Sequence, residues 1–430
     1  MDRLPVKRIW LYPRTWGVGF LGPAATIKGG VALLGVGLID AIGMGLYLAG
    51  SAIYFVLVVG LSSTQVGVGL SIAGLLGMVA QPILGSLADQ YGPRRILILL
   101  YLWRALSLAA LSVTGSFLVF AVVAAMIGVS QQSLPPVYQA LVERIAGSQA
   151  RVAIMARTRV VYNVGFSLGG VLATVAIGYG TRLAFASIVL GNALCCALAA
   201  LFLSRLGVRD QQTRDATNSA KKTRLRSLRD FPYLSVAAVN GILGLHSSLL
   251  AVGVPLWVTL HTDAPRALVG ALLVVNTIFA VLMQIRAARG SDTIDGSITA
   301  LRRCAYALVG CCCIFALSRT WHVTAAVVAF MILGVIILTI AEVLQAAGGW
   351  GLSYALAPAE GRAEHLSTFN LGIGAQLALG PTIVTVGVID HGTAGWLALA
   401  GAFAVTAAII SPLATAAARR PALAGTAAGS

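Results

Sequence analysis

Two carboxylates lie inside long apolar stretches of the sequence, Asp40 after Val31 and Glu342 within residues 323–347. Asp40 follows Val31 by about nine residues, which places it roughly 14 Å along a helix at 1.5 Å per residue. A charge at that depth in a membrane is costly unless it faces a cavity or a partner. We therefore expect Asp40 and Glu342 to bind and release protons. A protonated or paired aspartate that only packs helices is the alternative for Asp40.

Arg104 is a cation inside another apolar stretch, roughly 12 Å further along it than Arg95 at the same rise per residue. An arginine side chain can extend part of that distance toward a membrane surface, but not all of it. We expect Arg104 to form a buried ion pair with Asp40 or with another acceptor. Its predicted role is structural.

Few other polar side chains interrupt the apolar stretches. Those predicted to line a substrate cavity are Gln131, Gln132, Asn240 and His246. So few hydrogen-bonding groups favour compounds of low polarity, cationic ones included, over sugars. A structural role inside the protein is the alternative for His246.

Signatures of enzymes, pumps and metal sites are missing from the sequence. No glycine precedes any lysine, so there is no phosphate-binding loop of the kind that ATP-driven pumps use. The histidines are scattered, and no C-x-x-C or H-x-x-x-H pair occurs. We expect neither enzymatic activity nor a cofactor or bound metal, and we expect the cysteines to serve as small packing residues.

The elements that must position these residues are membrane-spanning helices. Of the 430 residues, 58% are hydrophobic and only 10% are charged, and the mean hydropathy is +0.89. Soluble domains carry about 25% charged residues. The apolar stretches are each close to the ~20 residues that a bilayer requires. They span residues 31–57, 65–85, 96–114, 117–139, 160–180, 183–204, 232–260, 267–287, 304–318, 323–347, 367–388 and 394–415.

The twelve stretches fall into two groups of six, separated by a polar segment rich in arginine and lysine. The sequence thus predicts an all-α membrane protein with two six-helix bundles. The predicted divisions are an N-terminal cytoplasmic segment (residues 1–30), a first bundle (31–204), a cytoplasmic linker (205–230), a second bundle (231–415) and a cytoplasmic tail (416–430).

The distribution of basic residues predicts the orientation. A net charge of +16 would suggest nucleic-acid binding in a soluble protein. Here, however, the predicted loops on one side hold almost all arginines and lysines, and the other side has only Arg182, Arg266 and Arg319. Positively charged loops remain in the cytoplasm. We therefore expect a multi-pass plasma-membrane protein with both termini cytoplasmic and with no nucleic-acid partner.

A short charged loop joins the second and third stretches, with the pattern G-x-L-A-D-x-x-G-x-R-R over residues 85–95. It closely resembles the loop between helices two and three of the major facilitator superfamily. The resemblance implies a transporter. We expect it to be a monomer and to use no cofactor. The resemblance also implies that the loop aspartate faces the start of the eleventh helix, where the helix dipole attracts a negative charge.

Glu143 follows the fourth stretch on the same predicted side, where it could meet Arg94 or Arg95. We expect these residues to hold the two bundles together on the cytoplasmic side. We name the set the latch, and it comprises Gly85, Asp89, Gly92, Arg94, Arg95 and Glu143.

The fifth stretch is rich in glycine, with Gly165, Gly169 and Gly170 on a predicted helix-packing face. It resembles the fifth-helix motif of antiporters in the superfamily, although Ser167 replaces the usual proline. The fourth stretch also lacks the arginine that drug-exporting members commonly carry. The resemblance implies proton-coupled export of a hydrophobic or amphipathic small molecule. Uptake of a nutrient or metabolite, or a membrane receptor that transports nothing, are the alternatives.

Overall fold

The computed structural model describes residues 21–53, 60–112, 116–179, 181–207, 225–262, 264–265, 268–319 and 323–420. The predicted N-terminal segment up to residue 20, most of the predicted linker and the last ten residues of the tail lie outside the described residues. The described part of the chain is helical and contains no strand.

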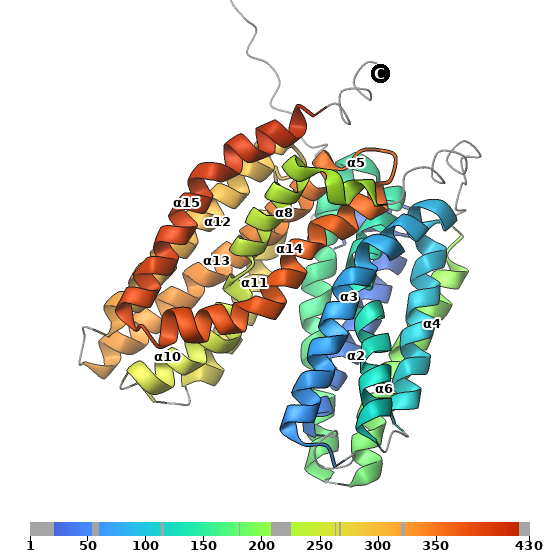
Figure 1. Ribbon diagram of the computed structural model, residues 1–430, viewed down its shortest axis with the longest axis horizontal. Helices are drawn as coiled ribbons and strands as arrows, with labels where there is room; N and C mark the ends of the chain where they lie inside the picture. The colour runs from blue at the N-terminus through green and yellow to red at the C-terminus, as the bar shows by residue number, and fades with distance from the viewer. Residues whose placement is uncertain are drawn as a thin grey trace, which may run out of the picture.

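The first half of the chain forms one bundle of long helices (Figure 1). Its elements are α1 (Pro23–Thr26), α2 (Gly30–Ile53), α3 (Ser63–Tyr91), α4 (Pro93–Leu111), α5 (Phe117–Tyr179) and α6 (Arg182–Arg205). The second half forms another. It begins with a short 3₁₀ turn and comprises η2 (Arg226–Arg229), α8 (Phe231–Leu243), α9 (His246–Ser248), η3 (Leu249–Gly253), α10 (Val254–His261), α11 (Leu268–Ala287), α12 (Ile294–Ser318), α13 (Thr324–Leu356), α14 (Arg362–Thr382), η4 (Ile383–Ile389) and α15 (Thr393–Ala418).

Ten helical segments of the described chain are long and apolar enough to cross a membrane. One of them, α5, is two rods that join at Gly147, where φ is 66° and the backbone is not helical. The helix α4 adds another segment of 19 residues, although it carries Arg94, Arg95 and Arg104. Together these make the twelve predicted helices, and the predicted all-α membrane fold is confirmed.

Several helices differ from the predicted stretches. The ninth, α12, begins at Ile294 rather than near residue 304, because its first turns carry charged residues that are not apolar. The seventh stretch is not one regular helix. It comprises α8, α9, the π-helical η3 and α10, with Pro255 at the start of the last.

Each bundle has its own apolar core. Large apolar side chains also cover the outside of the helices, among them Leu106 (71% exposed), Val171 (63%) and Leu282 (60%). An exposed apolar surface of this extent is expected where lipid, not water, is the solvent. The protein is therefore a multi-pass membrane protein.

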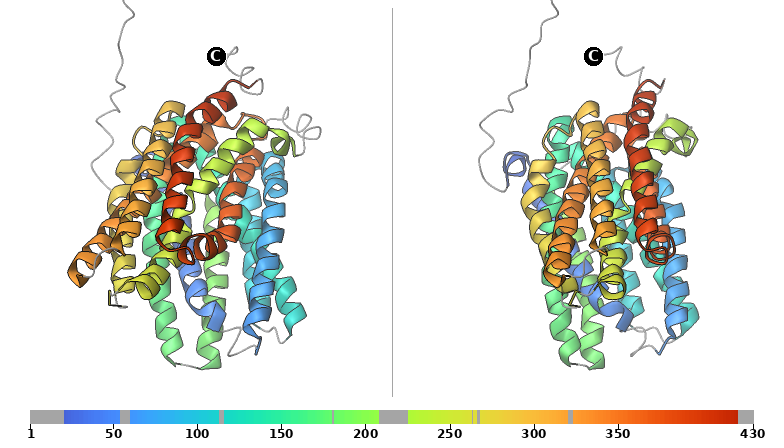
Figure 2. Two further views of the ribbon diagram at one scale, coloured as in Figure 1. Left: turned by 60° about the vertical axis from the view of Figure 1, so that its left-hand side comes forward. Right: turned by 90° about the vertical axis from the view of Figure 1, so that its left-hand side faces the viewer.

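The two bundles contact each other mainly near one end of the molecule, which we name the linker end. It holds the end of α6 at Arg205, the turn η2 and the end of α15 at Ala418. There, Tyr354 and Leu366 of the second bundle pack into the core of the first. Toward the opposite end the ribbons of the two bundles diverge in Figure 1, and in the turned views of Figure 2 the second bundle lies in front of the first.

Candidate functional site

Asp89 of the first bundle binds the start of α14 in the second bundle. Its two carboxylate oxygens accept hydrogen bonds from the main-chain N–H groups of Ala363 (2.8 Å) and Glu364 (2.9 Å). These N–H groups have no partner within the helix, and they carry the positive end of its dipole. A carboxylate of one bundle thus caps a helix of the other.

Two glycines of the predicted latch have specific steric roles. A Cβ added at Gly85 would lie 2.4 Å from the hydroxyl of Ser367, so only glycine allows α3 and α14 to come this close. Gly92 has a φ of 94°, which residues with a side chain rarely adopt, and it forms the turn between α3 and α4.

Glu143 joins the same interface, but with other partners than the sequence predicted. Among the described residues it pairs with Arg151 of its own bundle and with Arg362 of the second bundle, not with Arg94 or Arg95. Arg94 donates instead to the main-chain oxygens at the end of α6. The prediction was wrong because Arg362 is distant in the sequence and only the fold brings it close.

A second set of polar contacts joins α5 to α13 at the linker end. Gln139 donates to the hydroxyl of Ser353 (2.7 Å), and the hydroxyl of Tyr354 donates to the main-chain oxygen of Gln139 (2.8 Å). The guanidinium of Arg151 lies 4.7 Å from the centre of the Tyr354 ring. These contacts and those of Asp89 close the linker end of the molecule.

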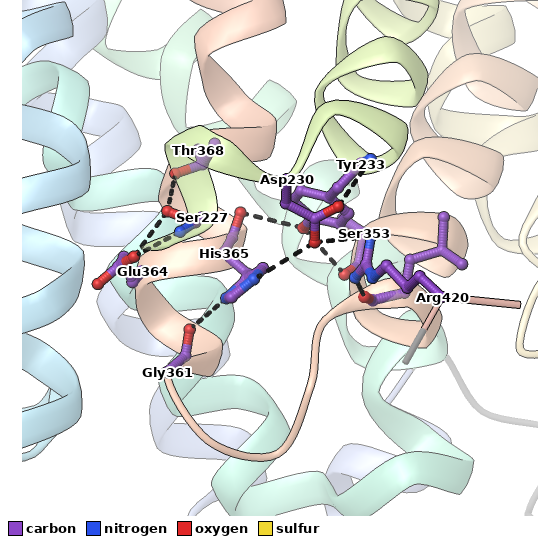
Figure 3. Close-up of polar contacts among 10 residues, drawn as sticks. Ser227, Asp230, Tyr233, Ser353, Gly361, Glu364, His365, Thr368 and Arg420 are labelled. Carbon is purple, nitrogen blue, oxygen red and sulfur yellow. Dashed lines mark hydrogen bonds and ion pairs between the residues drawn. The ribbon is translucent and has the colours of Figure 1, made fainter. Parts of the chain in front are cut away.

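The end of the linker is bound to the same helix start (Figure 3). The carboxylate of Glu364 accepts hydrogen bonds from the main-chain N–H groups of Leu225 (3.1 Å) and Ser227 (2.9 Å). The hydroxyl of Ser227 also contacts both Glu364 and Thr368 at 2.7 Å. Glu364 therefore uses its N–H to bind Asp89 and its side chain to bind the linker.

Asp230 and Arg420 add an ion pair beside this contact. Nη1 of Arg420 lies 3.0 Å from Oδ2 of Asp230, and the same oxygen lies 3.9 Å from Nε2 of His365 (Figure 3). Arg420 stacks over the ring of Tyr233. Burial lowers the pKa of Arg420, while Asp230 opposes that shift. Arg420 also donates to the main-chain oxygen of Leu356, so the end of α15 is bound to the start of α8 and the end of α13.

In the first bundle, Arg104 and Asp40 form an ion pair in the interior. Arg104 Nη1 lies 3.2 Å from Asp40 Oδ1, and the side chains are 2% and 17% exposed. A second guanidinium nitrogen contacts the sulfur of Met44. The pair joins α4 to α2, and Asp40 is its more accessible member.

Glu342 is paired as well, with a cation that sequence analysis missed. Arg159 of α5 donates from Nη2 to Glu342 Oε1 at 3.2 Å, and Asn276 donates to Oε2 at 3.0 Å. The fifth predicted stretch begins at residue 160, which leaves Arg159 just outside it, but the second rod of α5 begins after Gly147, about twelve residues before Arg159. Counting helical rise from that glycine would have placed Arg159 deep in the span.

The predicted cavity residues separate into two groups. Asn240 accepts a hydrogen bond from Gln345 (2.9 Å), and the buried His246 interacts with both Gln345 and Glu342. Gln132 accepts from Gln81 (3.2 Å) in the first bundle, and Gln131 beside it is half-buried. The structure therefore gathers Asn240 and His246 around Glu342, while the two glutamines lie on α5.

Two of the three predicted packing glycines face α2 closely. A Cβ at Gly165 would lie 2.8 Å from the main-chain oxygen of Leu38, and one at Gly169 would lie 2.1 Å from that of Ile42. A Cβ at Gly170 would meet nothing within 4 Å. Close packing thus requires Gly165 and Gly169, but not Gly170. Within the described residues, no group of three or more His, Cys, Asp or Glu could hold a metal ion.

Comparison with known proteins places this fold and its interface in context. The family model described as Major Facilitator Superfamily matches residues 33–381. No curated protein matches the chain. Among solved structures, the human organic anion transporter MFSD10 (TETRAN) is similar, with a TM-score of 0.58, 16% identity, and coverage of 90% of this chain and 99% of that one. A bacterial homologue of the iron transporter ferroportin in its outward-facing state has a TM-score of 0.66, 16% identity, and coverage of 91% and 99%. At this identity the likeness concerns the fold alone.

Proposed function

The chain belongs to the Major Facilitator Superfamily, and we propose that it is a proton-coupled secondary transporter that exports a hydrophobic or amphipathic small molecule by alternating access. It is a transporter and not an enzyme. The observation that carries the proposal is the bond between the carboxylate of Asp89 and the start of α14. This contact joins the two bundles at one end only, as alternating access requires.

We assign the linker end to the cytoplasm because basic residues gather there. On that assignment the protein is closed toward the cytoplasm and parted toward the outside, with both termini cytoplasmic, in the plasma membrane. The latch then stabilises one of the two states of the transport cycle. Opening it must break the bonds of Asp89 and the ion pair between Glu143 and Arg362.

Proton coupling is assigned to Asp40 and Glu342, one in each bundle. Each carboxylate is held by a guanidinium at 3.2 Å. A proton and a guanidinium compete for the same oxygens, so protonation would release the pair and change the contacts between helices. Rocking of the bundles would then change the side from which each carboxylate is reached.

The predicted substrate has low polarity because the polar groups near Glu342 are few and mostly bonded to one another. Gln345 donates to Asn240, and Asn276 donates to Glu342. Uptake of a metabolite by the same fold is the alternative, as is a receptor that binds without transport. We expect the transporter to act as a monomer, with protons, the small molecule and the lipid bilayer as its partners.

Reconstitution into liposomes tests the proposal. Radiolabelled hydrophobic and amphipathic compounds are offered to vesicles loaded with the same unlabelled compound, and counterflow is measured. Inverted vesicles under an imposed pH gradient then give the direction and the coupling. Binding without counterflow would support the receptor, and accumulation driven only toward the cytoplasmic face would support uptake.

A further inference from the structure

The ion pair between Arg159 and Glu342 lies far from the ends of the helices that carry it, α5 and α13. Arg159 follows Gly147 by about twelve residues and Glu342 precedes Leu356 by about fourteen, which are roughly 18 Å and 21 Å of helix. Both side chains are therefore near the middle of their spans. Because Arg159 belongs to the first bundle and Glu342 to the second, the pair lies between the bundles, where a substrate must pass.

The two members of the pair are not equally accessible. The Arg159 side chain is 41% exposed, whereas the Glu342 side chain is 12% exposed. A solute that reaches this level between the bundles meets the guanidinium first. A cationic solute would have to reach the enclosed carboxylate, and an anionic one would not.

Not all N–H donors of Arg159 are used in the ion pair with Glu342. A guanidinium carries five N–H donors. Nη2 donates to Glu342, and Nε is buried without a hydrogen-bond partner in the part of the chain that the structure describes, so an external acceptor would meet the exposed end of the guanidinium. An oxyanion can accept two parallel hydrogen bonds from such a group, which a neutral ligand cannot match.

An apolar surface adjoins this guanidinium. Tyr162 and Phe166 follow Arg159 by three and seven residues, so all three share one face of α5. The two rings are stacked, with centres 6.3 Å apart and planes at 18°. The apolar rings therefore lie along the face of α5 that also carries the guanidinium.

Glu342 can lose its contact with Arg159 and still keep a partner, because Asn276 holds its other oxygen at 3.0 Å. If an external anion replaces Glu342 on Arg159, the Glu342 carboxylate therefore still accepts the hydrogen bond from Asn276. Glu342 and a second oxyanion can therefore compete for the guanidinium of Arg159.

We propose that Arg159 binds the acidic group of the transported molecule, and that the substrates are amphipathic organic acids. The carboxylate would replace Glu342 on the guanidinium, and the apolar body would lie against Tyr162 and Phe166. This inference rests on the proposed transport function, whose substrate class it names, but it is independent of the direction of transport. The sequence favoured compounds of low polarity, cationic ones included, and it gave no reason to expect acids because it did not place Arg159 beside Glu342.

Equilibrium binding to the purified full-length protein in detergent tests the inference without requiring transport. The probes are matched triplets in which one apolar body, naphthyl, biphenyl or decyl, carries a carboxylate, a carboxamide or a methylammonium group. A ligand that binds the folded protein raises the unfolding temperature according to its concentration and affinity. We expect carboxylates to give the largest shift for at least one body.

Four variants separate charge recognition from packing. Arg159→Gln should weaken carboxylate binding roughly tenfold to hundredfold and leave the carboxamide unchanged. Glu342→Gln removes the competitor and should strengthen carboxylate binding about fivefold. Phe166→Ala should weaken both ligands alike. Arg157→Gln, a control on another face of the same helix, should change neither.

A larger shift with the ammonium members, or no carboxylate preference with any body, would overturn the inference. So would a carboxylate preference that survives Arg159→Gln. Counterflow of a neutral compound together with no carboxylate preference would refute this inference while leaving the transport function intact. Carboxylate binding without counterflow would do the reverse.

Discussion

Asp89 and Ala363 are far apart in the sequence, yet a hydrogen bond of 2.8 Å joins the carboxylate of the first to the N–H of the second. The bond stabilises contact between the bundles only while they meet at the linker end. It therefore contributes to the stability of one conformation, not to that of the fold in general. Changes at Asp89 should alter transport more than folding.

Asp89→Asn is expected to slow transport. The variant keeps the size of the side chain but loses the negative charge, and a charge at a helix N-terminus contributes about 0.3–2 kcal/mol. A loss of about 1–2 kcal/mol from one conformation changes its population roughly fivefold to thirtyfold. The initial rate of counterflow per mole of reconstituted protein measures the effect, and expression and ligand binding should stay nearly unchanged. Asp295→Asn, at an exposed position of α12, is the control. An unchanged rate for Asp89→Asn would show that the latch does not limit transport.

Arg104→Ala should destabilise the protein in detergent. Removing one partner of a buried ion pair typically costs about 3–5 kcal/mol, and the partial exposure of Asp40 places the expected loss near the lower value. Arg104→Lys should restore stability only in part, because a lysine is a point charge without the planar fork of a guanidinium. Thermal unfolding measures both variants, with Arg302→Ala at an exposed position as the control. An alanine variant as stable as the original protein would contradict the structural role of the pair.

Asp40→Asn and Glu342→Gln should uncouple transport from protons. Each variant removes a carboxylate that a proton and a guanidinium share, but it leaves the rest of the site in place. Counterflow should therefore survive, while accumulation driven by a pH gradient is lost in inverted vesicles. Glu360→Gln, at an exposed position before α14, is the control. If both variants still concentrate the substrate, the protons take another route.

Gly169→Ala and Gly170→Ala form a matched pair of adjacent substitutions. A methyl group at Gly169 would collide with the main-chain oxygen of Ile42, whereas one at Gly170 would meet open space. We expect Gly169→Ala to lower the free energy of unfolding by about 1–3 kcal/mol, as overpacking does. Gly170→Ala should be neutral or stabilise by up to ~1 kcal/mol. Equal unfolding temperatures for the two variants would argue against close packing of α5 on α2.

The parts of the structure that the sequence predicted are those set by local patterns. Apolar stretches gave the twelve helices, and the charged loop from Gly85 to Arg95 gave the residue that joins the bundles. The partner of Arg104 was among those expected, because Asp40 was one of few acceptors available at that depth. Each of these needed only the neighbouring residues and the thickness of a membrane.

The errors concern helix ends and partners from the other bundle. Arg159 was placed in a loop because polar and basic residues, Arg151 and Arg157 among them, interrupt the apolar pattern after Gly147, although the helix has already begun there. Glu143 was assigned to the nearer arginines, although Arg362 approaches it from the second bundle. Long-range pairing depends on how the bundles meet, and no local pattern of residues determines that.

Glu364 contacts both Asp89 of the first bundle and the linker between the bundles. Its N–H binds Asp89, and its carboxylate binds the linker at Leu225 and Ser227. The contact between the bundles and the contact with the end of the linker therefore share one residue. If opening of the linker end also detaches the linker from Glu364, then by linkage a molecule that binds the detached linker more tightly favours opening, and opening strengthens that binding by the same factor. A linker of this kind can sense the transport state as well as join the bundles.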